Sequence, residues 1–349
     1  MKISTAFVVD RDIGIMSCRL GLDWDLVRKY PQGINGEKWD LSWLCLNETL
    51  DINFIIDNPQ GIDGQCWNLV SLSSNRSLDW DFVRENLRGI GGKMWYTPFL
   101  SINPNLDWTF VREYPQGICG RPWSVTDLSS HPKLDWDYVR EKPQGLGSQR
   151  WDTFKLSSNP SLDWNYVRQN PQGLNGQPWN TKKLSKNPKL DWSLVQENPT
   201  GFQGQPWDME SLSANPSLTW DFLCQHPNGV GGQPWNISHL SFHKCLDWNY
   251  VRQHPEGFNG QPWHIMNLSF NPTLDWNLLY QYPEGLNGSP WSTRCLSHNE
   301  NLPFNLVEIH PTGFNGETWD MYFLSSQNWT RNDNRFKKTK SAREGRSAH

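Results

Sequence analysis

Residues 162–189 read LDWNYVRQNPQGLNGQPWNTKKLSKNPK, and the same 28-residue pattern returns along most of the chain. Three markers recur at this step without a slip: an opening leucine (Leu22 to Leu302), a loop glycine (Gly33 to Gly313) and a tryptophan (Trp39 to Trp319). Eleven copies without insertion or deletion cover residues 22–329. A strict short period indicates one quasi-linear array of repeats. We number the positions of each repeat from 1 at its opening leucine.

The first part of each repeat predicts a short helix. Asp163 is a suitable N-cap, because its carboxylate can accept hydrogen bonds from the unpaired amides of the first turn. One copy has Thr219 instead, which is another capping residue. The helix is expected to run from Trp164 to about Asn170, because the next residue, Pro171, cannot donate an amide and restricts its predecessor.

The loop and a second short helix follow. Gly173 and Gly176 let the backbone reverse, and Trp179 then leads into the second helix. The position after this tryptophan holds a capping residue in nine of the eleven copies. This helix is expected to end near Leu184. The G-x-x-G loops lack the lysine and the long helix of phosphate-binding loops, so we interpret them as turns.

One repeat cannot bury its own apolar side chains, among them Leu162, Trp164, Trp179 and Leu184. Stacked neighbours supply the missing surface. The sequence therefore predicts an all-α fold, an elongated solenoid of eleven two-helix repeats. The expected domains are an N-terminal segment with a half-repeat cap (1–21), the solenoid (22–329) and a disordered basic tail (330–349).

Catalysis, cofactors and metals are not expected. The seven cysteines are scattered without a C-x-x-C pair, which argues against a disulfide framework or a zinc site. His226, His254 and His310 share one repeat position, but we expect solvated turn histidines there rather than metal ligands. No nucleophile–base pair recurs, and no segment approaches membrane-spanning length. We therefore predict a non-enzymatic protein without a membrane span in a reducing compartment.

Four arginines in consecutive repeats share position 7 and form a candidate binding stripe: Arg84, Arg112, Arg140 and Arg168. Such a stripe can grip phosphates or carboxylates in bidentate fashion. We favour the alternative that each arginine pairs with a neighbouring acid, stacks on tryptophan or caps its helix. Of the net charge of −4, the tail contributes +5 and the rest of the chain −9, which opposes binding to a polyanion.

Position 22 varies freely while the framework stays fixed. Along the chain it holds Trp43, Ser71, Phe99, Asp127, Lys155, Lys183, Ser211, His239, Asn267, Cys295 and Phe323. Such a pattern is typical of an extended recognition surface, although relaxed constraint on a solvated face produces the same pattern.

The motif N-P-x-L-D/T-W, as in NPSLTWDFL from Asn215, together with P-W-x-x-x-x-L-S, resembles tryptophan-rich repeat proteins of giant DNA viruses. The G-x-x-G loop departs from that family's pattern. The resemblance implies a viral protein made in the infected host cytoplasm and leaves packaging in the virion open; it implies no known activity. We predict a protein-binding or scaffolding module of unidentified partner, and self-association stays open. The alternative is a nucleic-acid-associated protein that uses the arginine stripe and the basic tail.

Overall fold

The computed structural model describes residue 17 and residues 21–326, and these contain 22 short helices, two for each of the eleven repeats. The first helices are α2 (Trp24–Lys29), α4 (Ile52–Asp57), α6 (Trp80–Glu85), α8 (Trp108–Glu113), α10 (Trp136–Glu141), α12 (Trp164–Gln169), α14 (Trp192–Glu197), α16 (Trp220–Gln225), α18 (Trp248–Gln253), α20 (Asn277–Gln281) and α22 (Phe304–Ile309). The second helices are α3 (Leu41–Leu46), α5 (Leu69–Ser74), α7 (Thr97–Ile102), α9 (Val125–Ser129), α11 (Thr153–Ser157), α13 (Thr181–Lys186), α15 (Met209–Ser213), α17 (Ile237–Phe242), α19 (Ile265–Phe270), α21 (Thr293–Ser297) and α23 (Met321–Ser326). The predicted all-α repeat architecture is confirmed.

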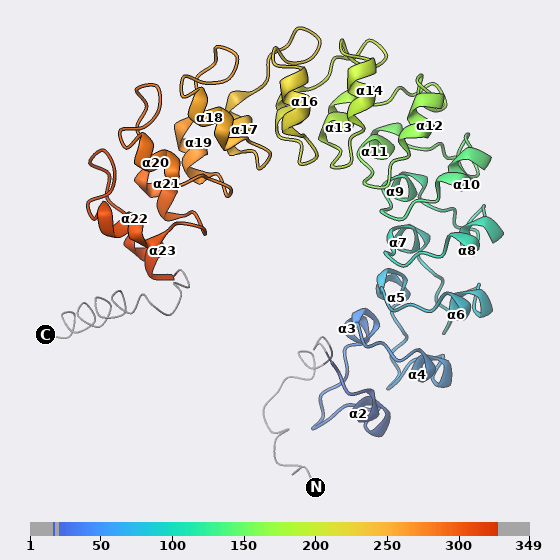
Figure 1. The fold of residues 1–349 in the computed structure, drawn as a ribbon. Coiled ribbons are helices and arrows are strands. Elements are labelled where there is room, and N and C mark those ends of the chain that lie inside the picture. The colour runs from blue at the N-terminus through green and yellow to red at the C-terminus, as the bar shows by residue number, and fades with distance from the viewer. Residues whose placement is uncertain (1–16, 18–20, 327–349) are drawn as a thin grey trace, which may run out of the picture. The chain divides into compact units, whose positions relative to one another are not determined.

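The chain divides into two compact units, an N-terminal unit up to Asn180 and a C-terminal unit from Thr181 onward. Within each unit, the second helices of neighbouring repeats contact one another in series, from α3 to α11 and from α13 to α23. Within each unit, Figure 1 shows the second helices as one row and the first helices as another. This serial contact between neighbours is the packing of a helical solenoid. Most of the expected half-repeat cap and the whole basic tail lie outside the described residues.

Short polar side chains start most of the helices. Asp163 accepts a hydrogen bond from the Tyr166 amide at 3.0 Å, and Thr219 accepts one from the Phe222 amide at 3.3 Å. One cap was not anticipated, because His264 begins α19 and its Nδ1 accepts from the Asn267 amide at 3.3 Å. These caps satisfy amides that helices of five or six residues otherwise leave unpaired.

The glycine loop is a tight hairpin turn. Leu174 and Gln177 exchange two backbone hydrogen bonds of 3.0 and 2.8 Å, and between them Asn175 and Gly176 have φ angles of 54° and 75°. Positive φ at both central residues is the geometry of a type I′ turn, which favours Asn-Gly. Gly173 precedes the turn with φ 84°, and a Cβ there would lie 1.9 Å from the Gln177 carbonyl oxygen. The position therefore accepts only glycine.

The tryptophan at position 18 ties each loop to its first helix. Trp179 is fully buried, and its Nε1 donates a 2.7 Å hydrogen bond to the carbonyl of Asn170, the C-cap residue of α12. All eleven tryptophans at this position bond the carbonyl nine residues earlier. Leu162 and Leu184 are buried beside them, whereas Trp164 at position 3 is only half-buried.

The L-S-x-N-P motif joins each repeat to the next through buried hydrogen bonds. The Ser157 hydroxyl donates to the Thr153 carbonyl and accepts from the Asn180 amide at 3.0 Å. The Asn159 amide group donates to the carbonyls of Ser129 and His131, 30 and 28 residues earlier, at 2.9 and 3.0 Å. We call this series of bonds the asparagine ladder. The recurring L-S-x-N-P motif therefore has a structural role in joining neighbouring repeats.

Ser17 makes the same contacts ahead of the first full repeat. Its hydroxyl accepts from the Asp40 amide at 3.3 Å, and its carbonyl accepts from Asn47 Nδ2 at 3.2 Å. Ser17 therefore occupies the place that a repeat serine occupies elsewhere in the ladder.

Candidate functional site

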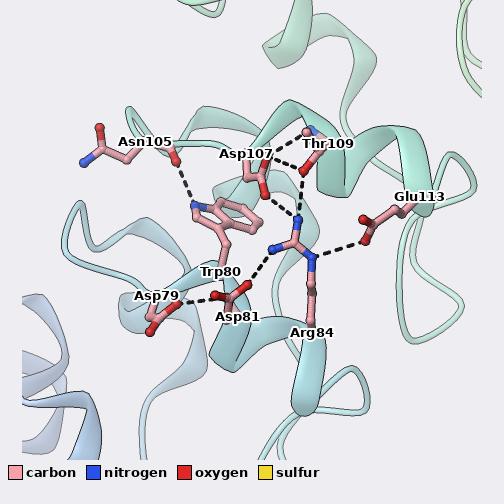
Figure 2. Close-up of polar contacts among 8 residues, drawn as sticks. All are labelled: Asp79, Trp80, Asp81, Arg84, Asn105, Asp107, Thr109 and Glu113. Atoms are coloured by element: carbon pink, nitrogen blue, oxygen red, sulfur yellow. Dashed lines mark hydrogen bonds and ion pairs between the residues drawn. The ribbon is translucent and has the colours of Figure 1, made fainter.

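Each arginine of the candidate stripe lies in the last turn of a first helix, and Arg84, Arg112 and Arg140 bind carboxylates of the next repeat. Figure 2 shows Arg84 on α6 reaching across to α8, where it binds the N-cap carboxylate of Asp107. The same guanidinium donates to Thr109 Oγ1 at 2.9 Å, to Glu113 at 3.2 Å and to Asp81 of its own helix at 2.9 Å. One side chain thus links two repeats and reinforces a helix cap.

The next two arginines repeat this arrangement. Arg112 donates to Asp135 at 2.8 Å and to Glu141 at 2.5 Å, and its guanidinium lies 4.7 Å from the centre of the Tyr138 ring. Arg140 binds Asp163, the N-cap of α12, and lies over the Tyr166 ring. Arg168 lies half-buried in the last turn of α12. Arg28 also binds Asp51, the N-cap of α4, and Arg252 binds Asp275 at position 2 of the following repeat.

We call this contact the arginine clamp: position 7 of one repeat bound to the capping aspartate at position 2 of the next. Although burial acts to raise it, the pKa of Asp107 is lowered by hydrogen bonds from Thr109 and Arg84. The cap therefore stays ionised over a wide range of pH. The aromatic partner is the ring at position 5 of the next repeat, whereas the sequence interpretation had named tryptophan.

At two junctions between repeats of the C-terminal unit, both the arginine and the aspartate of the clamp are replaced. Gln196 stands where the arginine would be and Thr219 where the aspartate would be. Similarly, Tyr280 is followed by Pro303, and there the Tyr280 hydroxyl accepts a hydrogen bond from Asn305 at 3.1 Å. At two further junctions only the arginine is replaced, by Ile56 and Cys224, while Asp79 and Asp247 remain. The proposed role of the stripe in binding stays a prediction.

The histidines that share position 9 lie at the ends of first helices. Their carbonyls accept the hydrogen bonds of the position-18 tryptophans. The rings of His226 and His254 lie against Phe222 and Tyr250, with centroids 4.5 and 4.3 Å apart. His310 lies instead against Phe314 of the following loop, with centroids 4.4 Å apart. Within residues 21–326 and at residue 17, no three His, Cys, Asp or Glu side chains gather as metal ligands.

The cysteines differ widely in exposure. Cys66 and Cys224 are exposed, whereas Cys45 is buried in the position that serine usually holds in the ladder. Burial raises the pKa of the Cys45 thiol to about 12, which keeps it protonated. A buried, protonated thiol is inert as a nucleophile.

The solvent-exposed side of the second helices is formed by positions 21, 22 and 25, and we call it the second-helix face. Positions 20, 23 and 24 of the same helices are buried in most repeats. In the N-terminal unit the face exposes Trp43, Leu46, Val70, Ile102 and Phe154, and in the C-terminal unit Phe242, Met266, Phe270, Tyr322 and Phe323. Large exposed apolar side chains on neighbouring helices are typical of an interaction surface.

Sequence reasoning identified only part of this face. Position 22 is exposed at Trp43 and Phe323, but Ser211 and Cys295 at the same position are buried. Positions 21 and 25 carry most of the exposed apolar side chains and were missed. The 3.6-residue helical period places them beside position 22, so the signal was available once the second helix had been assigned.

Two further features lie on this face or beside it in the C-terminal unit. Helix α13 carries Lys182, Lys183 and Lys186, and Lys189 follows it. A groove of about 510 Å³ lies where α17 and α19 begin; it is lined by Asn236, Ile237, Ser238, Gly260, Gln261, Pro262, Trp263 and His264. In the C-terminal unit the face therefore has a cationic end at α13 and an apolar end at α17 and α19, with the groove beside the apolar end.

In the part of the chain that the structure describes, no helix has the length and apolar character needed to cross a membrane. Comparisons of the chain with protein-family models, with curated proteins and with solved structures gave no match.

Proposed function

We propose that this protein is a non-enzymatic binding or scaffolding module that holds protein partners on its second-helix face. One observation carries the proposal: the framework side chains are buried in the same contacts from repeat to repeat, while the exposed face changes chemistry at each step. A fixed backbone with a variable exposed stripe is how helical repeat arrays present binding surfaces.

The arginine clamps favour a protein partner over a nucleic acid. Three guanidinium groups of the stripe, those of Arg84, Arg112 and Arg140, already bind carboxylates of the following repeat. A phosphate would have to displace those carboxylates, and the net charge of −9 outside the tail would oppose its approach. Nucleic-acid association through the basic tail remains the alternative that the experiment below separates.

The resemblance to giant-virus repeat proteins supports a place of action in the infected host cytoplasm, with packaging in the virion as a second proposal. Mass spectrometry of purified particles would test the second proposal directly, since a packaged protein is recovered at constant ratio to the capsid.

Affinity capture with the full chain tests the function. Partners are collected from infected host cells that produce the protein, with and without nuclease. The natural chain, a face variant and a control variant are compared. The face variant combines Trp43→Ser, Ile102→Ser, Phe242→Ser and Phe270→Ser. The control combines Ile56→Ser and Met94→Ser, which are exposed apolar residues outside the second-helix face.

We expect protein partners that survive nuclease, persist with the control and are lost with the face variant. Partners that are lost with nuclease would support the nucleic-acid alternative. Partners that bind the face variant as well as the natural chain would refute the proposed site.

A further inference from the structure

We propose that the second-helix face of the C-terminal unit binds an acidic–apolar protein segment, with its acidic residues at α13 and its bulky apolar residues at α17 and α19. The inference rests on the proposed function and names the class of partner for one part of the same surface.

The cationic end consists of Lys182, Lys186 and Lys189, which are all exposed. Lys182 approaches Asp208 at 4.0 Å. No other ion pair of these three side chains occurs among the residues that the structure describes. A compact group of lysines with so little internal compensation favours an acidic ligand.

The remainder of the C-terminal unit has the opposite sign. Residues 190–326 hold three Lys or Arg against thirteen Asp or Glu, a net charge of −10. A long polyanion such as nucleic acid would be repelled along this stretch, since it carries negative charge at every residue. A short acidic cluster that ends at the lysines avoids this repulsion. The charge pattern therefore favours a protein segment with localised acids.

The apolar end consists of Phe242 on α17 with Met266 and Phe270 on α19. Their side chains are 52, 55 and 39% exposed. The groove of about 510 Å³ lies at the N-terminal ends of the same two helices, beside the face, and only Ser238 of its lining belongs to the face. Large apolar side chains of a partner would cover these exposed residues.

Both ends belong to one continuous row, because α13, α15, α17 and α19 contact one another in series. Neighbouring packed helices lie about 8–10 Å apart, so α13 and the apolar end are separated by about 16–30 Å. An extended chain covers this in about five to nine residues, at about 3.3 Å each. Glu210 on α15 is exposed between the two ends, which excludes acidic residues from the middle of the bound segment.

A selection of random displayed peptides against the full chain tests the inference. The enriched peptides are synthesised, and their dissociation constants are measured by fluorescence anisotropy at low and high salt. The key variant combines Lys182→Glu, Lys186→Glu and Lys189→Glu. The matched control combines Lys29→Glu, Lys93→Glu and Lys142→Glu, which makes the same change in net charge at exposed lysines away from the face. Circular dichroism verifies that both variants keep the helical fold.

We expect enriched peptides with an acidic cluster about five to nine residues from bulky apolar residues. Their binding should weaken about ten- to hundredfold in the key variant, less than threefold in the control, and further at high salt. Phe270→Ser should weaken it independently, with Ile309→Ser as the exposed apolar control.

The outcomes separate the two proposals. Peptides that need Phe270 but carry no acids, or that bind the lysine variant equally well, would overturn the inference and leave the binding function standing. The same holds if single-stranded nucleic acid binds the lysine cluster in preference to every peptide. If no selected peptide is affected by any substitution on the face, the proposed function fails as well.

Discussion

At the scale of single residues, the glycine before each hairpin is fixed by contact rather than by conformation alone. Gly173→Ala should lower the free energy of unfolding by about 3 kcal/mol or more, because left-handed backbone disfavours a side chain and the added Cβ meets the Gln177 carbonyl. Gly176→Ala should cost only about 1–2 kcal/mol, since nothing lies within 4 Å of its added Cβ. Urea denaturation of both variants measures the difference. Equal losses would contradict the steric argument.

Two histidines replace asparagine in the ladder and give it a dependence on pH. His131 is buried; its Nε2 lies 2.8 Å from the Asn103 carbonyl, and its Nδ1 accepts from the Lys133 amide. Burial lowers the pKa of His131 and of His243. A lowered pKa in the folded state means that the unfolded chain binds the proton more readily. The stabilising contribution is therefore complete above the unfolded pKa of about 6.5 and is lost as the pH falls below it.

The free energy of unfolding should fall less steeply between about pH 7.5 and pH 5.5 in the double variant His131→Asn and His243→Asn. Each histidine that is removed should reduce this slope by up to about 1.4 kcal/mol per pH unit. Denaturation at a series of pH values measures it. The reverse change, Asn159→His, should steepen the same loss. An unchanged slope in both variants would show that the ladder tolerates an imidazolium.

The clamp between Arg112 and Asp135 should show measurable coupling. In a double-mutant cycle with Arg112→Gln and Asp135→Asn, we expect a coupling of about 0.5–1.5 kcal/mol that decreases with salt, because both side chains are partly buried. The more exposed pair Arg76–Glu48 is the control and should couple more weakly. Equal coupling energies in the two cycles would show that the clamp stabilises the fold no more than an exposed ion pair does.

At the scale of the element, helices of five or six residues persist because other parts of the repeat satisfy their ends. Trp179 bonds the C-cap carbonyl of α12, whereas Nε1 of the half-buried Trp164 has no partner among the described residues. Trp179→Phe should therefore cost about 2–4 kcal/mol, and Trp164→Phe about 1 kcal/mol. Thermal denaturation of the two variants tests this order. A larger loss for Trp164→Phe would show that packing outweighs the carbonyl bond.

The elements were predictable where local chemistry decides them. Asp163, Pro171 and Gly173 each fix a boundary or a turn, so the two helices and the loop between them followed from the sequence. The arginine clamp was less accessible, because its aspartate lies 23 residues away and the intervening loop had to be folded first. The exposed positions 21 and 25 were missed because only one variable position was followed, although its helical neighbours share the same surface.

At the scale of the whole molecule, each repeat depends chiefly on its neighbours. Asn159→Ala removes two buried hydrogen bonds to the preceding repeat, which should cost about 2–3 kcal/mol. The His131 carbonyl keeps its bond from the Leu134 amide, whereas the Ser129 carbonyl loses the Asn159 donor. Stability in an array is the sum of nearest-neighbour terms. Hydrogen exchange should therefore increase in repeats four to six, and residues 246–301 should keep their protection. A uniform increase along the chain would indicate one global cooperative unit instead.

The asparagine ladder also bears on how such a chain changes in evolution. Each rung joins side chains of one repeat to carbonyls 28 and 30 residues earlier, and the chemistry of the rung is nearly the same at each step. If a block of 28 residues is removed or duplicated, each ladder asparagine still faces equivalent backbone carbonyls in the repeat that now precedes it. Unequal recombination between copies can therefore alter the number of repeats while every junction stays compatible. The number of second helices exposed on the array is then a trait that selection can adjust in whole steps.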